Sequence, residues 1–316
     1  MQVHRDINNL PGFKNAVITI GTFDGMHTGH QQITNLLKQE AKNIIGESVI
    51  ITFNPHPRMI VQNIKTSQKE NAVKINLLNT ADEKILLIEN QGIDHLVIVP
   101  FTHEFSLLSA EEYIEQFLVE KFHPHTIIIG YDHRFGKQRQ GNYKLLEECA
   151  EKYNYYVKEI PEHVINHTAI SSTKIREAIS SGDIETANKF LGYDYFFEGI
   201  VVEGDKIGRT IGYPTANIKP LEEDKLIPGN GVYAVQVILG NGLLKIGMMN
   251  IGFRPTVGGI KKMIEVNIFD FNEDIYGQRI KILLKKYLRP EQKFPGLEAL
   301  KAQLAIDKAN ALKLLS

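Results

Sequence analysis

A ten-residue string near the N-terminus combines residue types that bind phosphate groups. It runs from Gly21 to His30 and reads GTFDGMHTGH. Its three glycines let the backbone turn tightly and come close to a ligand. The start of a following helix would offer free N–H groups and a partial positive charge to an anion. His27 and His30, three residues apart, add side-chain donors. Such a group can stabilise the charge that grows on a phosphorus atom under attack, without a protein nucleophile.

A second string with similar chemistry lies in the C-terminal part of the chain. It runs from Gly204 to Asn217 and reads GDKIGRTIGYPTAN, which differs from the P-loop pattern GxxxxGK[ST]. Its glycine N–H groups and Lys206 are suited to hold phosphates. Thr215 and Asn217 are two residues apart, so their side chains project from one face of an extended segment. Hydroxyl and amide oxygens are suitable ligands for Mg²⁺, so the pair has the chemistry to hold that metal beside bound phosphates.

Residues 17–191 alternate short apolar runs with helical patterns, as in a parallel sheet covered by helices. The apolar runs predict buried strands at 16–21, 48–53, 95–99 and 126–130. The helical patterns predict helices at 30–44, 82–91, 109–121 and 143–152. In the third helix, Ser109 and Glu112 can satisfy each other's free backbone donors as a capping box. Open α/β sheets bind ligands at the carboxyl ends of their strands, which is where the first string lies.

After Leu191 the sequence changes to alternating, aromatic and β-branched segments separated by glycine. They predict strands at 195–202, 231–239, 245–251, 263–271 and 279–287, and then a helix at 296–315. Short alternating strands of this kind indicate a small antiparallel barrel. The fold is therefore predicted to be an α/β domain, residues 1–186, followed by a barrel domain with a C-terminal helix, residues 187–316.

The composition is that of an ordinary globular protein. Among 316 residues, 43% are hydrophobic and 23% are charged, and the formal net charge is −1. A charge so close to zero gives no global reason to expect binding to nucleic acid or to an anionic membrane. The single cysteine, Cys149, favours a reducing compartment. With no signal-like N-terminus and no apolar stretch of membrane-spanning length, the protein is predicted to be cytoplasmic, and an oligomer is possible.

The HxGH at His27–His30 resembles the nucleotidylyltransferase superfamily, and the full ten-residue string is similar to its bacterial FAD synthetase branch. Three further strings match in the family's order: Thr52–Arg58, Gly130–Gly136 and Ile170–Arg176. The resemblance implies a Rossmann-like domain in which two histidines, His27 and His30, act in catalysis. It implies that ATP contacts Gly21, Thr22, Phe23, Asp24, Gly25, His27, His30, Ser172, Thr173 and Arg176. It also implies a flavin pocket lined by Asn54, His56, Pro57, Arg58, Asp132 and Phe135.

This chain departs from that family at one position. It has Asp132-His133 where the family more often has a pair such as Asp-Phe. The difference falls among the residues that would contact the flavin.

The string at Gly208–Asn217 closely resembles the GxxxGxPTAN signature of riboflavin kinases. Asn250–Thr256, Glu265–Phe271 and Leu288–Glu291 match other strings of that family, in order. The resemblance implies that ATP contacts Gly204, Lys206, Gly208, Thr210, Gly212, Pro214, Thr215 and Asn217, with Mg²⁺ at Thr215 and Asn217. It implies flavin contacts from Arg254, Arg289 and Glu291. It assigns Glu265 as the base that takes the proton from the ribityl hydroxyl.

Together the two resemblances predict a bifunctional enzyme. The C-terminal domain would phosphorylate riboflavin with ATP to give FMN, and the N-terminal domain would join FMN to AMP to give FAD. The small molecules involved are riboflavin, FMN and ATP, with Mg²⁺ as cofactor and FMN and FAD as products.

The residues alone leave alternatives open. Alternation along 263–269 by itself favours Glu265 as an outward-facing strand carboxylate, and only the family resemblance favours the role of a base. His56 could close a turn, Asp24 could be structural, and paired His27 and His30 could bind a metal, although no third ligand has a fixed spacing nearby. At the level of the whole chain, the alternatives are a nucleotidyltransferase for another small phosphorylated substrate and a non-catalytic flavin-binding regulator.

Overall fold

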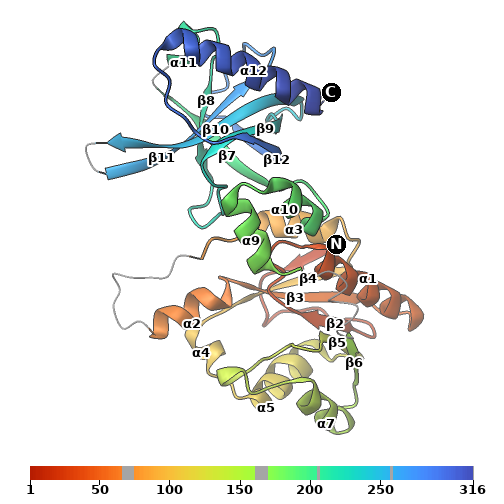
Figure 1. The fold of residues 1–316 in the computed structure, drawn as a ribbon. Coiled ribbons are helices and arrows are strands. Elements are labelled where there is room, and N and C mark those ends of the chain that lie inside the picture. Colours follow the sequence, from red (N-terminus) through yellow and green to blue (C-terminus); the bar gives the residue numbers. More distant parts are fainter. Residues whose placement is uncertain (66–74, 161–169, 205–206, 257–258, 316) are drawn as a thin grey trace. The chain divides into compact units, whose positions relative to one another are not determined.

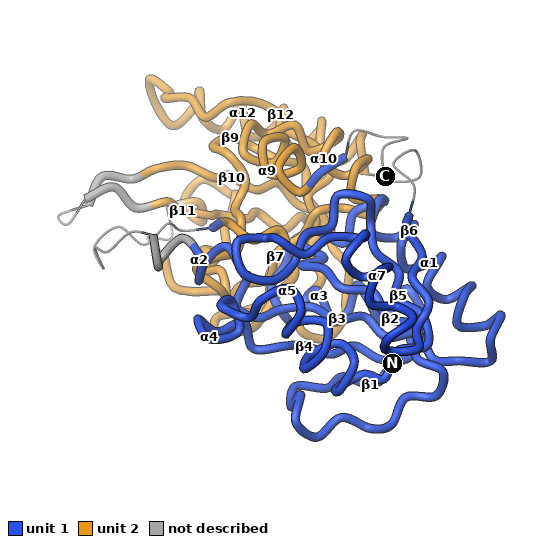
Figure 2. The backbone as a smooth tube through the Cα atoms, turned by 90° about the horizontal axis from the view of Figure 1, so that it is seen from below, with its two compact units in different colours: residues 1–75, 79–171 blue, residues 76–78, 172–316 orange. Residues whose placement is uncertain are grey.

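The computed structural model describes residues 1–65, 75–160, 170–204, 207–256 and 259–315. The chain forms two compact units, which Figure 2 shows in different colours. The first contains Met1–Ile75 and Asn79–Ser171, and the second contains Asn76–Leu78 and Ser172–Ser316.

The first unit is built on a six-stranded sheet in which every pairing is parallel (Figure 1). The strands are β1 (Gln2–His4), β2 (Val17–Ile20), β3 (Ser48–Asn54), β4 (His95–Pro100), β5 (Thr126–Gly130) and β6 (Tyr156–Ile160). Their order is β1-β4-β3-β2-β5-β6. From β2 the chain goes first to β3 on one side and later to β5 on the other. The order therefore reverses at β2, which is where parallel sheets of this kind bind ligands.

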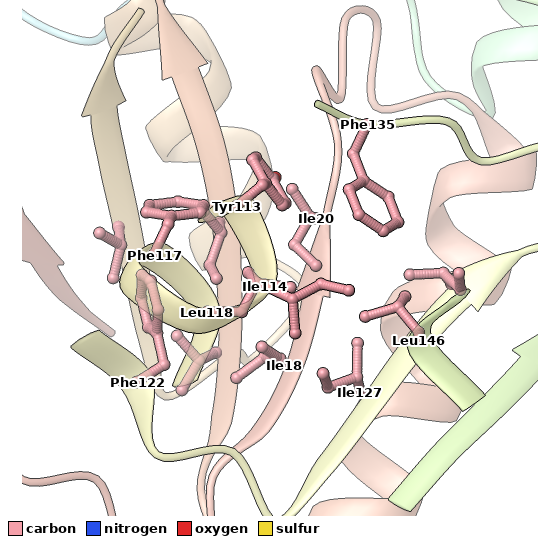
Figure 3. Close-up of a cluster of buried hydrophobic side chains, with 14 of the residues drawn as sticks. Ile18, Ile20, Tyr113, Ile114, Phe117, Leu118, Phe122, Ile127, Phe135 and Leu146 are labelled. Carbon is pink, nitrogen blue, oxygen red and sulfur yellow. The ribbon is translucent and has the colours of Figure 1, made fainter. Parts of the chain in front are cut away.

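Helices cover both faces of this sheet. On one face, α1 (Thr28–Asn43) and α3 (Ala81–Glu89) bury Leu37 and Ile88 against strand residues such as Ile50. The other face is covered by α7 (Tyr143–Tyr153) and by a continuous helical stretch made of α5 (Ala110–Glu112), the π-helical turn η2 (Tyr113–Val119) and α6 (Glu120–Phe122). Side chains of these helices pack against Ile18 and Ile20, as Figure 3 shows. The predicted α/β architecture is thus confirmed for this unit.

Two capping boxes set the starts of helices in the first unit. The predicted box at Ser109 is present, with Glu112 N donating to Ser109 Oγ at 3.1 Å and Ser109 N donating to Glu112 Oε2 at 2.8 Å. A second box starts α3, where Thr80 and Glu83 exchange bonds in the same way. Such a cap stabilises a helix start by about 1 kcal/mol. The other helical pieces among the described residues of this unit are α2 (Pro57–Lys65), α4 (His103–Ser106) and η3 (Lys137–Arg139).

The second unit contains a closed six-stranded barrel of order β10-β11-β8-β7-β12-β9, with antiparallel pairings. The strands are β7 (Phe196–Val202), β8 (Ala216–Pro220), β9 (Gly231–Ile238), β10 (Leu244–Thr256), β11 (Gly259–Ile268) and β12 (Arg279–Arg289). The helices are α9 (Ser172–Ser181), α10 (Ile184–Leu191), α11 (Ile207–Thr210) and α12 (Leu297–Leu315). The C-terminal helix α12 packs on the barrel's outer face, where Ala311 meets Met248 and Phe269. The predicted barrel and its terminal helix are confirmed.

The division between the compact units falls at Ser171/Ser172, earlier than the predicted domain boundary at 186/187. Asn188 on α10 shows why helices before the barrel group with it. Its amide nitrogen donates to Leu284 O at 2.9 Å, and its oxygen accepts from Tyr195 N at 2.7 Å. Within the described ranges, none of the helices combines the length and apolar character that a bilayer crossing requires.

Candidate active sites

The first candidate site is the loop that leaves β2 and enters α1. His27 is the N-cap of α1, and its Nδ1 accepts from His30 N at 3.4 Å. A nitrogen that accepts carries no proton, so the proton of neutral His27 is on Nε2. The His30 ring stacks on the His27 ring with a centroid distance of 3.7 Å and an interplanar angle of 16°. The helix start therefore carries two stacked imidazoles.

Burial keeps both imidazoles neutral. It lowers the pKa of His27 from 6.5 to about 4, although the Asp24 carboxylate opposes the shift. It also holds the pKa of His30 well below 6.5, and a charge on this ring would in addition be repelled by the Lys84 ammonium and by any charge on His27. His30 Nδ1 is buried, and it has no hydrogen-bond partner in the described part of the chain. Neutral imidazoles can donate hydrogen bonds to phosphate oxygens, but they bring no full positive charge.

The other residues of the loop divide into backbone and structural contributors. The Phe23 side chain is only 2% exposed and packs in the core, which leaves its backbone for a ligand. Asp24 is equally buried, and its Oδ1 accepts from Asn79 N at 3.3 Å, so a structural role has support. Gly21 N donates to Ile51 O at 3.0 Å and ties the loop to β3. Gly25 has a φ of 90°, a backbone conformation that favours glycine.

The predicted flavin residues at the end of β3 lie beside this loop, because β3 and β2 are parallel neighbours. Asn54 is the last residue of β3, and Pro57 begins α2. Between them, His56 Nδ1 accepts from Arg58 N at 3.2 Å, so the imidazole does close a turn. Asn54 and the side chain of Arg58 are exposed. This strand end therefore offers an amide and a guanidinium at the same edge as Gly21.

On the other side of β2, the loop after β5 carries Asp132, His133 and Phe135. Phe135 pairs with Gly141 through both backbone hydrogen bonds, which closes the loop. Its ring is 6% exposed and stacks on Tyr113 with centroids 5.0 Å apart, inside the cluster shown in Figure 3. Its ring therefore supports the loop from the core side. Asp132 is exposed, whereas His133 Nε2 is buried without a partner among the described residues, and burial lowers the pKa of His133 to about 4.

The remaining predicted triphosphate ligands are on α9, which belongs to the second unit. Ser172 begins that helix, Thr173 is exposed, and Arg176 Nε donates to Asn76 O at 2.8 Å. The two hydroxyls thus lie in the first turn of a helix, the end whose partial positive charge favours an anion.

The second candidate site is a row of polar side chains across three barrel strands. Asn217 of β8 pairs with Glu265 of β11, and Glu265 pairs with Asn250 of β10. Directly paired residues in a sheet project to the same side, so the three side chains share one face. Asn217 is 6% exposed, and its Oδ1 is buried without a partner in the described ranges. A buried amide oxygen without a partner is costly, and a bound Mg²⁺ would satisfy it.

Small residues make room for this row. A Cβ added at Gly204 would lie 1.9 Å from Asn217 Nδ2, so the amide occupies the space above that glycine. A Cβ at Gly208 would lie 2.2 Å from Tyr213 O, and Gly212 has a φ of 82°. These contacts explain the glycines of the predicted ATP-binding string in physical terms. Thr210 and Pro214 are exposed beside them, and Thr215 is partly buried.

Asn267 also belongs to this site, although the family resemblance assigned it no role. Its Nδ2 donates to Pro214 O at 2.6 Å, and its side chain is 6% exposed. Asn267 therefore fixes the turn that carries Thr215 and Asn217. Its position in the sequence could have indicated this, because it lies two residues after Glu265 and therefore on the same face of the strand.

Two of the residues predicted to contact flavin in the barrel unit, Glu291 and Arg289, contact different parts of that unit. A Cβ at Gly252 would lie 2.1 Å from Glu291 Oε1, so Glu291 rests on the backbone of β10. Arg289 forms a salt bridge to Asp307 of α12, with Nη2 to Oδ2 at 2.8 Å, and its Nη1 donates to Pro290 O. The guanidinium therefore joins β12 to α12. Lys206 and the side chain of Arg254 lie outside the described residues.

Asp307→Ala is expected to destabilise the second unit by about 3 kcal/mol, because removing one partner of a buried pair leaves the other without compensation. Asp307 is 1% exposed and also accepts from Gln303 at 2.9 Å. The measurement is the unfolding midpoint in urea, followed by circular dichroism. The control is Asp270→Asn, which removes an 85% exposed charge 3.4 Å from Lys308 and keeps a residue type that tolerates the positive φ of 51° at this position. Equal midpoints for the two variants would contradict a role for Asp307 in anchoring α12.

The fold and the two polar sites define a two-unit nucleotide-handling protein, with an α/β unit followed by a barrel. The family model described as FAD synthetase matches residues 11–174, and the one described as riboflavin kinase matches residues 191–315. The chain belongs to the family of bifunctional riboflavin kinases and FMN adenylyltransferases.

Relatives along the whole chain support this membership. A bifunctional riboflavin kinase/FMN adenylyltransferase of Haemophilus influenzae is 35% identical over 312 residues, with 98% of each chain covered. The protein of that name from Listeria monocytogenes is 38% identical over 295 residues, which cover 93% of this chain and 90% of the relative. A solved structure from Streptococcus pneumoniae, described as a macrolide-efflux protein, is 28% identical with a TM-score of 0.85 and 98% coverage of both chains.

Proposed function

We propose that the two reactions of this family are divided between the two sites described above. The chain is a bifunctional transferase that phosphorylates riboflavin with ATP to FMN and adenylylates FMN with ATP to FAD and pyrophosphate. The proposed division assigns residues 187–316 to the kinase reaction and residues 1–186 to adenylyl transfer. The observation that carries it is the polar row of Asn217, Glu265 and Asn250, which offers a metal ligand and a base on one face of the barrel.

For adenylyl transfer, we propose that a phosphate oxygen of FMN attacks the α-phosphorus of ATP while pyrophosphate leaves. The Nε2–H of His27 and the His30 ring donate hydrogen bonds to phosphate oxygens, and the loop backbone adds N–H groups. The ATP-contacting residues proposed are Gly21, Thr22, Phe23, Asp24, Gly25, His27, His30, Ser172, Thr173 and Arg176, with Phe23 acting through its backbone. The proposed flavin residues are Asn54, His56, Pro57, Arg58, Asp132 and Phe135, with Phe135 supporting the loop.

For the kinase reaction, we propose that Glu265 accepts the proton of the terminal ribityl hydroxyl as that oxygen attacks the γ-phosphorus of ATP. Thr215 and Asn217 would hold Mg²⁺, which neutralises phosphate charge when bound. Gly204, Lys206, Gly208, Thr210, Gly212 and Pro214 would line the ATP site around that pair. Arg254, Arg289 and Glu291 are the proposed flavin residues, with Arg289 acting through the segment that its salt bridge to α12 fixes.

Purified protein incubated with riboflavin, ATP and Mg²⁺ is expected to form FMN first and FAD afterwards. Without Mg²⁺, in excess chelator, both products are expected to disappear, because the charge of the phosphates is no longer neutralised. Fluorescence-detected chromatography of the flavins over time measures both steps. A preparation that binds flavin tightly but yields neither product would overturn the catalytic assignment and favour a regulator instead.

The setting in the cell is also a proposal. We propose a cytoplasmic enzyme, supported by a single cysteine that is a free thiol. The formal net charge of −1 supports small molecules, rather than nucleic acid or membranes, as its partners. Its assembly into an oligomer is compatible with these properties.

A further inference from the structure

Lys84 reaches from α3 to the loop that carries the two histidines. Its Nζ donates to Thr22 O at 2.7 Å and to Thr52 Oγ1 at 3.3 Å, and Thr52 Oγ1 in turn donates to Thr22 O at 3.2 Å. The capping box of Thr80 and Glu83 fixes the first turn of α3, which contains Lys84. Helix α3, which covers one face of the sheet, thus places the Lys84 amine against Thr22 in the loop after β2.

Neighbouring groups influence whether the Lys84 amine is protonated. Asp24 faces it from the loop, and His30 faces it from α1. Burial lowers the pKa of Lys84 from 10.5 to about 8, and the Asp24 carboxylate opposes that shift. At neutral pH the side chain is therefore mainly an ammonium ion, while both neighbouring imidazoles are neutral.

Holding the loop does not by itself require an ammonium. A neutral amine has two N–H groups, which is enough for the bonds to Thr22 and Thr52. An ammonium has a third, and it has no acceptor among the described residues. The third donor and the full charge are therefore available for an anionic ligand.

We propose that the Lys84 ammonium supplies positive charge to the adenylyltransferase site and binds an oxygen of the ATP phosphates, while it holds Thr22 in place. This rests on the proposed location of that site at Gly21–His30. The two neutral imidazoles orient the phosphates by hydrogen bonds, and Lys84 offsets part of their negative charge. A charge-assisted bond of this kind is stronger than a neutral one.

The test compares Lys84→Arg, Lys84→Gln and Lys84→Met in the full-length protein, with FAD formation from supplied FMN as the assay. Glutamine retains N–H donors without charge, arginine retains charge, and methionine has neither. Loss of a bond from a charged group predicts that kcat/KM for ATP falls about 10- to 100-fold in Lys84→Gln and Lys84→Met. Lys84→Arg is expected to stay within a few-fold of the unchanged protein. FMN formation by the same preparations and their circular dichroism spectra report whether the protein is folded.

The pH dependence separates charge from position. In the unchanged protein, kcat/KM for ATP is expected to decline as pH rises through about 8, where the Lys84 ammonium loses its proton. Lys84→Arg should lack this decline, because a guanidinium does not titrate in that range. The control is Lys144→Gln, whose side chain is 80% exposed and which should show the unchanged profile.

His30→Ala is measured in parallel to separate two kinds of failure. If His30→Ala is impaired but Lys84→Gln has normal kcat/KM and a normal alkaline limb, Lys84 only holds the loop and the inference is wrong. If Lys84→Arg is as inactive as Lys84→Met, charge is not what the site needs, and the inference is equally wrong. If His30→Ala itself forms FAD normally, the site has been placed incorrectly and the role of Lys84 is lost with it.

Discussion

Glu265→Gln is expected to lower the rate of FMN formation by about 10³-fold, the usual contribution of a general base, and to leave FAD formation from supplied FMN unchanged. Glutamine keeps the size of the side chain but cannot accept the ribityl proton. Glu265 pairs with Asn217 and with Asn250 across the barrel, so its carboxylate lies on the face that carries the buried amide oxygen of Asn217. The measurement is the initial rate of each reaction with the same preparation.

The control for this variant is Glu273→Gln, an exposed carboxylate of the same unit, which should leave both rates unchanged. Glu265→Ala should stop FMN formation in the same way. Two results would contradict the assignment. A normal rate of FMN formation in Glu265→Gln would show that Glu265 is an ordinary strand carboxylate and not the base. Loss of both reactions in a folded variant would contradict the division of the reactions between two sites.

The sequence predicts those elements whose apolar pattern is strong. The central strands are buried on both faces of the sheet, so each appears as a continuous apolar run, and 48–53 corresponds to β3 at Ser48–Asn54. Edge strands give no such signal. β1 is QVH and β6 is YVKEI, in which only Ile160 is buried, and neither was predicted. Their pairing with β4 and β5, rather than their own residues, makes them strands.

The candidate sites show the same limit. The glycine and histidine spacing predicts a ligand-binding loop between a buried strand and a helix, and the loop does lie between β2 and α1. The order of the strands, which places this loop at the switch point, was not predicted. Tertiary packing decides the rest: Phe135 sits in a motif string, yet its ring stacks on Tyr113 from the preceding helix. Lys84 gave no signal, because a lysine on a short amphipathic helix is normally solvated. Only the approach of α3 to β3 shows that its amine meets Thr52 and the loop.

His30→Ala is expected to lower the rate of FAD formation by about 10²- to 10⁴-fold, the range for a positioned donor in a transfer site. FMN formation should be unchanged, so FMN accumulates when the variant is given riboflavin and ATP. The physical reason is the state of the ring: it is buried, neutral and stacked on His27, with Nδ1 lacking a partner in the described residues. A neutral donor of fixed orientation stabilises the transition state without reorganisation at the moment of reaction.

Removal of the ring also removes the stacking partner of His27, so a second substitution keeps the result interpretable. His30→Gln retains an amide donor of similar reach and should recover part of the FAD rate, whereas a purely packing role would give similar losses in both variants. His103→Ala, at an exposed histidine of the same unit, is the matched control and should change neither rate. If His30→Ala stopped FMN formation as well while its circular dichroism spectrum stayed normal, the two reactions would share residues. Separate sites could then no longer account for this chain.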